Sequence, residues 1–109
     1  MKVIYTPNAP AAIGPYSQGY EVNGFVYTSG QIGVNPADGV APEGIEAQAH
    51  QSCKNVGAVL EAGGADLADF AAFNALYEQY FVSKPARSCV AVKTLPKGLL
   101  CEIEAIAEK

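Results

Sequence analysis

The sequence contains no tryptophan, one histidine, His50, and one arginine, Arg87. It also lacks a run of about eighteen apolar residues, the length that a membrane-spanning helix requires. Pro7 and Pro10 interrupt the apolar start of the chain, so no secretory leader is indicated. These absences lead us to expect a soluble, cytoplasmic protein that does not contact a membrane.

Basic residues are also scarce. Lys and Arg together number 7 and Asp and Glu 11, which gives a net charge of −4. A protein that binds nucleic acid through its phosphates needs the opposite sign. No Walker loop and no glycine-rich dinucleotide motif follows a strand-like run. We therefore expect neither nucleic acid nor a nucleotide cofactor as a ligand.

The three cysteines, Cys53, Cys89 and Cys101, lie far apart and form no Cys-x-x-Cys pair. An odd number at these spacings argues against a disulfide framework. With His50 they could make a zinc set on paper, but the usual paired ligands are missing. We expect no metal, and we interpret the cysteines as reduced, small, buried residues.

The length of 109 residues, half of them hydrophobic, predicts a single domain over residues 1–109. Asn23-Gly24 stands between two strand-like runs within residues 19–30, which predicts a β-hairpin. A third strand is expected at residues 31–34 and a turn at residues 35–39. The chain is thus predicted to open as an antiparallel meander.

Two helices are predicted to follow. Apolar residues recur at spacings of three and four from position 45 to position 60, and Gly63-Gly64 is a helix stop. A second periodic run extends from Phe70 to Tyr80, with Asp66 or Asp69 as a possible N-cap and Pro85 beyond its end.

The last quarter of the chain returns to strands, at residues 88–93 and 99–107, around a turn at residues 96–98. The expected order is β-β-β-α-α-β-β. In the final strand Glu102 and Glu104 share one face, while Cys101, Ile103 and Ala105 share the other. The ordinary interpretation of such glutamates is a solvated face.

Arg87 is the first candidate for a functional residue, because it follows Pro85 where a strand is expected to begin. A guanidinium suits bidentate capture of a carboxylate, although an exposed surface pair is the plainer alternative. Tyr16 lies in a proline-rich loop and could form either a pocket wall or a plug over the core. His50 falls inside a predicted helix, where a half-exposed structural residue is favoured over a catalytic one.

Several longer motifs carry a family resemblance. They are NAP at residues 8–10, IGPYSQG at 13–19, TSGQI at 28–32, KPARSCV at 84–90, LP at 95–96 and CEIEAIA at 101–107. In order and spacing these motifs resemble the Rid (YjgF) family, and in particular its RidA-type deaminases. The resemblance covers nearly the whole chain.

The resemblance implies an α+β, chorismate-mutase-like fold. In this fold a mixed, curved sheet carries two helices on one face, and a homotrimer with a central barrel has its ligand clefts between subunits. It also implies hydrolysis of short 2-imino or enamino acids, such as 2-iminopropionate and 2-iminobutyrate, to 2-keto acids and ammonia without a cofactor.

The resemblance also implies roles for individual residues. Arg87 matches the position that holds the substrate carboxylate, and Glu102 the position that manages water and protons. The remaining positions line or shape the pocket: Tyr16, Ser29, Gly30, Asn74 and Cys89. Cys89 is expected to act through its backbone groups rather than its thiol.

The chain departs from the family at one place. Family members have a further strand between the two helices, whereas residues 62–68 are too few for a strand of about five residues with its turns. Either the two helices join directly, or a segment is missing from this sequence. We favour the second, since deleting an internal strand would leave neighbouring backbone groups unpaired.

Two alternative functions stay open. The same arginine could serve a sensor that binds small carboxylates without converting them. The glutamate at position 102 favours an enzyme, because a sensor needs no proton-handling group. The ribonuclease or translation-inhibitor activity attached to some relatives is disfavoured by the acidic charge and by the lack of a basic, aromatic groove.

Overall fold

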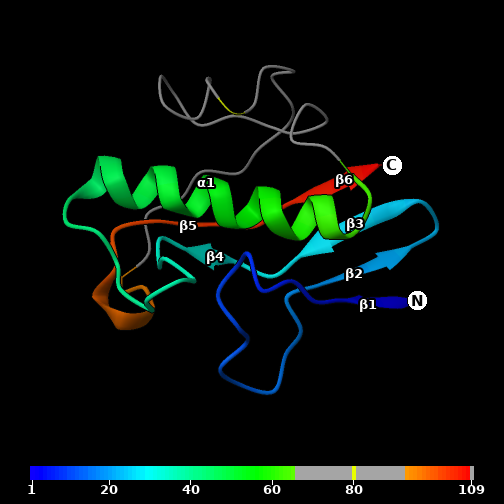
Figure 1. Cartoon of the computed structure of the whole chain (residues 1–109), viewed down its shortest axis with the longest axis horizontal. Helices are drawn as coiled ribbons and strands as arrows, with labels where there is room; N and C mark the ends of the chain where they lie inside the picture. The colour runs from blue at the N-terminus through cyan, green and yellow to red at the C-terminus, as the bar shows by residue number, and fades with distance from the viewer. Residues whose placement is uncertain (66–79, 81–92, 109) are drawn as a thin grey trace.

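The part of the chain that the structure describes is built around a four-stranded sheet and one helix. This computed structural model describes residues 1–65, 80 and 93–108. The four strands pair antiparallel in the order β1-β2-β3-β6. They are β1 (Lys2–Ile4), β2 (Gly19–Val22), β3 (Phe25–Thr28) and β6 (Ile106–Glu108). Helix α1 (Ile45–Ala62) lies across one face of this sheet (Figure 1).

The predicted hairpin is confirmed. β2 and β3 are joined by Asn23 and Gly24, both with positive φ, at 52° and 81°. Such a pair is typical of a type I′ turn, whose twist matches that of the flanking strands. Asparagine and glycine tolerate this backbone region better than other residues, so these two positions determine the register of the hairpin.

The predicted meander is wrong in its third strand. β4 (Gln31–Ile32) does not pair with β3 but with β5 (Glu102–Ile103), in a separate two-stranded sheet. The free edge of β3 is instead occupied by β6, which arrives from the far end of the chain. The meander is completed on the other side by β1, a strand of only three residues that the sequence pattern did not reveal.

The predicted strand over residues 99–107 is divided into β5 and β6, with Glu104 and Ala105 between them. Thr28 anchors this break, because the Ala105 carbonyl accepts from its backbone N–H at 2.8 Å and its hydroxyl accepts from the Ala105 N–H at 2.8 Å. The predicted alternation is nevertheless confirmed. Ile103 and Ala105 are buried, and Glu102 and Glu104 are exposed.

Helix α1 begins and ends where the sequence predicts. Beyond it, Gly64 has a φ of 86° and its N–H donates to the Glu61 carbonyl at 3.0 Å, while the Ala65 N–H donates to the Leu60 carbonyl at 2.9 Å. This is the Schellman arrangement, which satisfies carbonyls at the helix end. Gly63 lies so close to the sheet that a Cβ there would meet Val26 at 2.9 Å.

The core lies between α1 and the sheet. Its largest completely buried apolar side chains are Val26, Val56, Val59 and Leu60. Asn55, also completely buried, donates from Nδ2 to the carbonyls of Ile32 and Val34 at 3.0 and 2.8 Å. The helix therefore holds the end of β4 and the residues after it through polar contacts, whereas it holds the four-stranded sheet through apolar ones.

The turn at residues 35–39 and the turn at residues 96–98 are both present, the latter as a short 3-10 helix. The second predicted helix, apart from Tyr80, and most of the strand at residues 88–93 lie outside the described residues, as do positions 66–68 of the short connection. Among the described residues, no helix is long and apolar enough to span a membrane.

Candidate functional site

Glu102 is the predicted site residue whose surroundings are most informative. It lies on β5 opposite Ile32 of β4, and its side chain is exposed. The side chain lies directly against Gly30: a Cβ built at position 30 would fall 2.7 Å from Cδ and 3.0 Å from Cγ of Glu102. Real Cβ atoms do not approach carbon this closely, so the carboxylate occupies this place because residue 30 has no side chain.

Ser29 links this carboxylate to the N-terminal loop. Its hydroxyl donates to the Ser17 carbonyl at 2.5 Å, and its backbone N–H donates to the Gln18 carbonyl at 2.9 Å. The end of β3 is thereby tied to the residues that precede β2. The structure thus brings Ser29, Gly30 and Glu102 together from parts of the chain that are distant in sequence.

Tyr16 stands in the same loop and is 52% exposed. Its ring packs back on the loop, so that a Cβ added at Gly14 would lie 3.4 Å from it, and its backbone N–H donates to the Gly14 carbonyl at 2.8 Å. A side chain that is half in solvent is not a plug over the core. Of the two alternatives for Tyr16, the pocket wall is the one left as a prediction.

Three predicted site residues, Asn74, Arg87 and Cys89, lie outside the described residues. Their roles stay predictions. The described part of the predicted site is therefore the side that carries Glu102, and Arg87, which is expected to hold the substrate carboxylate, is not among the described residues.

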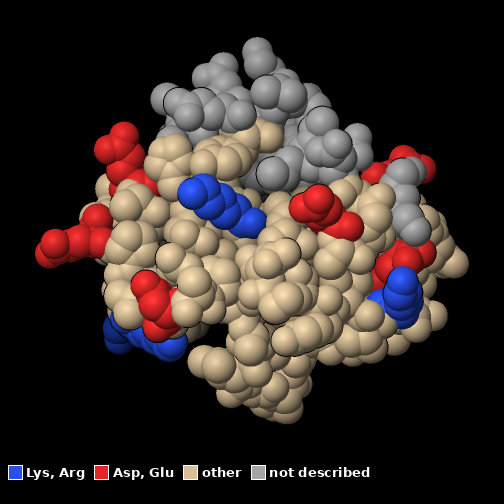
Figure 2. All heavy atoms as spheres, in the orientation of Figure 1, with Lys and Arg blue, Asp and Glu red and all other residues tan. Residues whose placement is uncertain are grey.

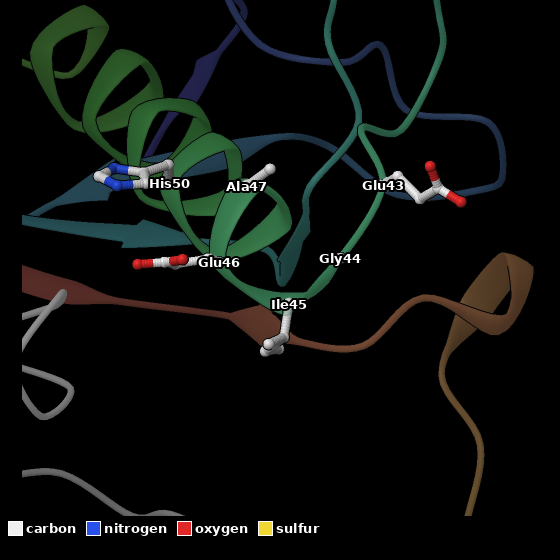
Figure 3. A pocket seen from close by; sticks show the side chains of 6 residues that line it. All are labelled: Glu43, Gly44, Ile45, Glu46, Ala47 and His50. Atoms are coloured by element: carbon white, nitrogen blue, oxygen red, sulfur yellow. The ribbon is translucent and has the colours of Figure 1, made fainter.

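A second group of polar side chains lies at the start of α1. A shallow pocket there is lined by Glu43, Glu46 and His50, among others. Glu46 and His50 project from the same side of the helix, while Glu43 points the other way (Figure 3). These three side chains therefore do not converge on one point. Among the described residues, no group of three or more potential metal ligands is present.

His50 has a structural partner, as its position in a helix suggested. Its Nδ1 lies 2.7 Å from the hydroxyl of Tyr80, and the two rings meet edge to face. The pKa of Tyr80 is raised, mainly by burial and to a smaller extent by Cys53. This contact ties the ring of Tyr80 to helix α1.

Cys53 and Cys101 are free thiols. Cys53 is buried among the core residues, and burial, with a smaller contribution from Cys101, raises its pKa to about 12. Such a thiol is protonated at neutral pH and is a poor nucleophile. For Cys53 the interpretation as a small core residue is thus confirmed. The Cys101 sulfur is half-buried, 3.6 Å from the Ser52 hydroxyl.

The family model described as Endoribonuclease L-PSP matches residues 6–109. A curated relative from Escherichia coli (strain K12), named 2-iminobutanoate/2-iminopropanoate deaminase, is 50% identical over 123 residues, which cover 97% of this chain and 96% of the relative. That alignment is longer than the chain, so at least 123 − 109 = 14 of its positions have no counterpart here. Where the shortening falls stays a prediction.

Solved structures agree with this match. The YjgF gene product from E. coli superimposes with a TM-score of 0.93 at 44% identity, covering 100% of this chain and 99% of that one. E. coli TdcF with bound serine superimposes with a TM-score of 0.93 at 40% identity, with 100% and 99% covered. The fold, the motifs and the family model lead to one conclusion: this chain belongs to the Rid (YjgF) family and is of the RidA type.

Proposed function

We propose that this protein hydrolyses short 2-imino and enamino acids to 2-keto acids and ammonia. The observation that carries the proposal is the exposed carboxylate of Glu102, held against Gly30 beside Ser29. The relative named as a deaminase is 50% identical over 97% of the chain and supports the same reaction.

The chemistry requires little of the protein. A protonated imine is already electrophilic, so the site must hold the substrate, place one water and move protons. Water adds to C2, the C2–N bond breaks, a C2=O bond forms and nitrogen leaves as ammonia. No electron is gained or lost, so the proposed reaction needs no redox cofactor. Glu102 would accept a proton from the water and return it to the nitrogen.

The other roles are proposed from the motif matches. Arg87 would hold the substrate carboxylate, since a guanidinium binds a carboxylate through two parallel hydrogen bonds. Ser29 and Gly30 would line the pocket beside Glu102, together with Tyr16, Asn74 and the backbone of Cys89. We propose no metal and no cofactor, and a cytoplasmic location.

We further propose a homotrimer with its sites between subunits and a central barrel. The support is the sheet face that α1 does not cover. The register there aligns one cross-strand row of apolar residues, and the exposed fractions of three of its members are 57% for Val3, 41% for Tyr27 and 63% for Ile106. An exposed apolar face of this kind is typical of a subunit interface. Light scattering at micromolar concentration should give three times the 11.4 kDa chain mass, and a monomer mass would contradict the trimer.

A small-carboxylate sensor on the same fold is the second candidate. It is favoured by the similar structure of TdcF, which holds bound serine. The endoribonuclease activity in the family model's name is a weaker candidate. On the face shown in Figure 2, the basic side chains of the described residues lie apart from one another and form no continuous basic band that could follow a phosphate backbone.

The deciding experiment measures ammonia and keto-acid release from freshly generated 2-iminopropionate and 2-iminobutyrate, beside calorimetric titration with 2-ketobutyrate. Glu102→Gln keeps the shape but removes the base, so kcat should fall by about 100-fold while 2-ketobutyrate still binds. Arg87→Ala should lose both turnover and 2-ketobutyrate binding. Arg87→Lys should restore little of either, because an ammonium lacks the planar, two-pronged geometry of a guanidinium.

If the wild type accelerates imine decay no more than buffer does, the hydrolase proposal is wrong. Binding of 2-ketobutyrate in the same experiment would then favour the sensor. If Glu102→Gln turns over like the wild type, only the role of Glu102 is wrong.

A further inference from the structure

Gln18 is the most highly connected buried side chain near the candidate site. It is 3% exposed and immediately precedes β2. Its Oε1 accepts from the backbone N–H of Thr6 at 2.7 Å. Its Nε2 faces the carbonyl oxygens of Thr6, Ala9 and Pro10 at 3.0, 3.2 and 2.9 Å, and these three acceptors share its two N–H groups. One donor on one side and three acceptors on the other leave a single orientation for the amide.

The partners of Gln18 belong to a segment that cannot support itself. Residues 5–18 are neither helix nor strand, and they include Pro7, Pro10 and Pro15, which lack a backbone N–H. Backbone groups in such a segment need partners from elsewhere. Gln18 supplies them for the first half of the segment, where Thr6 and Ala9 are buried.

The same residue touches the candidate site through its main chain. The Gln18 carbonyl accepts from the N–H of Ser29 at 2.9 Å, and the preceding carbonyl, of Ser17, accepts from the Ser29 hydroxyl. Ser29 is followed by Gly30, and the Glu102 side chain lies directly against Gly30. Tyr16 lies two residues before Gln18. Gln18 therefore joins the loop that carries Tyr16 to the strand end beside Glu102.

We propose that Gln18 is a positioning residue. It holds residues 6–16 and thereby determines where Tyr16 stands relative to Ser29 and Gly30, so that it controls substrate affinity rather than the chemical step. The inference rests on the proposed function, because it assigns Gln18 to that site. Its direct consequence, an ordered loop, does not depend on the reaction.

The first variant is Gln18→Met, which has a similar length but no polar atoms. We expect KM for 2-iminobutyrate and Kd for 2-ketobutyrate to rise about 10-fold, with kcat changed by less than about 3-fold. Hydrogen exchange of the amides at residues 8–16 should accelerate by about 10-fold or more, whereas exchange in α1 should stay as in the wild type.

Gln48→Met is the matched control. Gln48 is also a buried glutamine, 7% exposed, whose Nε2 donates to the Pro42 carbonyl at 3.0 Å and whose Oε1 accepts from the Leu100 N–H at 2.9 Å. It has no hydrogen bond to residues 6–16. Its loss should lower the unfolding temperature but leave KM, Kd and exchange at residues 8–16 unchanged.

Gln18→Glu gives an independent readout if the methionine variant does not fold. Ionised, the new carboxylate would face three carbonyl oxygens. Protonated, it would regain one donor while still accepting from Thr6. The ratio of its Kd for 2-ketobutyrate to that of the wild type should therefore decrease as the pH is lowered from 8 to 5.5.

The inference is wrong if Gln18→Met accelerates loop exchange but leaves KM and Kd at wild-type values, since the loop would then not serve the site. It is also wrong if loop exchange does not change, or if the Kd ratio of Gln18→Glu does not depend on pH. A wild type that binds 2-ketobutyrate but hydrolyses no imine would instead overturn the proposed function. Kd and loop exchange would then still decide the role of Gln18.

Discussion

The α1–sheet core and the edge that carries Glu102 are held by different forces. In the core, Val26, Val56 and Leu60 are completely buried between the helix and the sheet, and apolar burial supplies the stability. At the edge, Glu102 is exposed, and its neighbours Ser29 and Gly30 are fixed by hydrogen bonds and by close approach.

This difference matters for function. A carboxylate that handles water and protons must reach a water molecule, so the apolar burial that holds the core side chains does not place it. It has to be placed by contacts with neighbouring backbone, which contribute little to global stability. We therefore expect changes in the core to lower the free energy of unfolding, and changes at the edge to lower activity in a protein that stays folded.

Leu60→Ala should have the largest effect. Removing a completely buried leucine side chain at the end of α1 leaves a cavity, which should lower the free energy of unfolding by about 3 kcal/mol. Urea denaturation followed by circular dichroism measures this change. The fraction that stays folded should retain wild-type KM, and a raised KM would show that core and edge are more tightly coupled than the contacts indicate.

Alkaline pH should weaken the core through Cys53. Burial raises the pKa of this thiol from 9.0 to about 12, so the folded state keeps the proton while the unfolded chain releases it. Stability should therefore fall as the pH rises from about 9 towards 12, by about 2 kcal/mol at pH 10.5. Cys53→Ala lacks this titration. Denaturation at pH 8 and pH 10.5 should show a smaller loss in the variant, and equal losses would refute the assignment.

Gly30→Ala should affect the edge and spare the core. The new methyl group would collide with the Glu102 side chain, which is flexible and can swing into solvent, so we expect stability to change by less than about 0.5 kcal/mol. Imine hydrolysis should fall by about 10-fold or more, because the carboxylate is displaced.

Gly33→Ala is the contrasting control for that variant. A Cβ at position 33 would fall 2.8 Å from the Cα of Gln48, in the backbone of α1, which cannot move aside. This variant should lose stability in urea denaturation, whereas Gly30→Ala should lose activity. If Gly30→Ala is the less stable of the two variants, the interpretation that Gly30 leaves room for the Glu102 side chain is wrong.

Gly64→Ala should have the smallest effect on activity and tests the backbone conformation at the end of α1. Its φ of 86° is unfavourable for a residue with a side chain, so the free energy of unfolding should fall by about 1 kcal/mol. Thermal unfolding measures this change, and the activity of the folded protein should not change.

Local order in this protein could be predicted from the sequence. Asn23-Gly24 predicts the hairpin, because positive φ is acceptable there. Gly63-Gly64 predicts the end of α1, and the alternation around Ile103 predicts which side chains are buried. Each of these features depends on residues that are close together in the chain. The motifs, read as a whole, also indicated the family to which the chain belongs.

Only the tertiary structure decided which strands pair and which side chains meet. β4 was expected beside β3, yet it pairs with β5, because β6 takes the free edge of β3. The close contact between Glu102 and Gly30 and the hydrogen bonds of Gln18 could not be predicted from the sequence either. Strand pairing and side-chain contacts depend on which edges and surfaces meet after the chain has closed long loops. No neighbouring residue in the sequence carries that information.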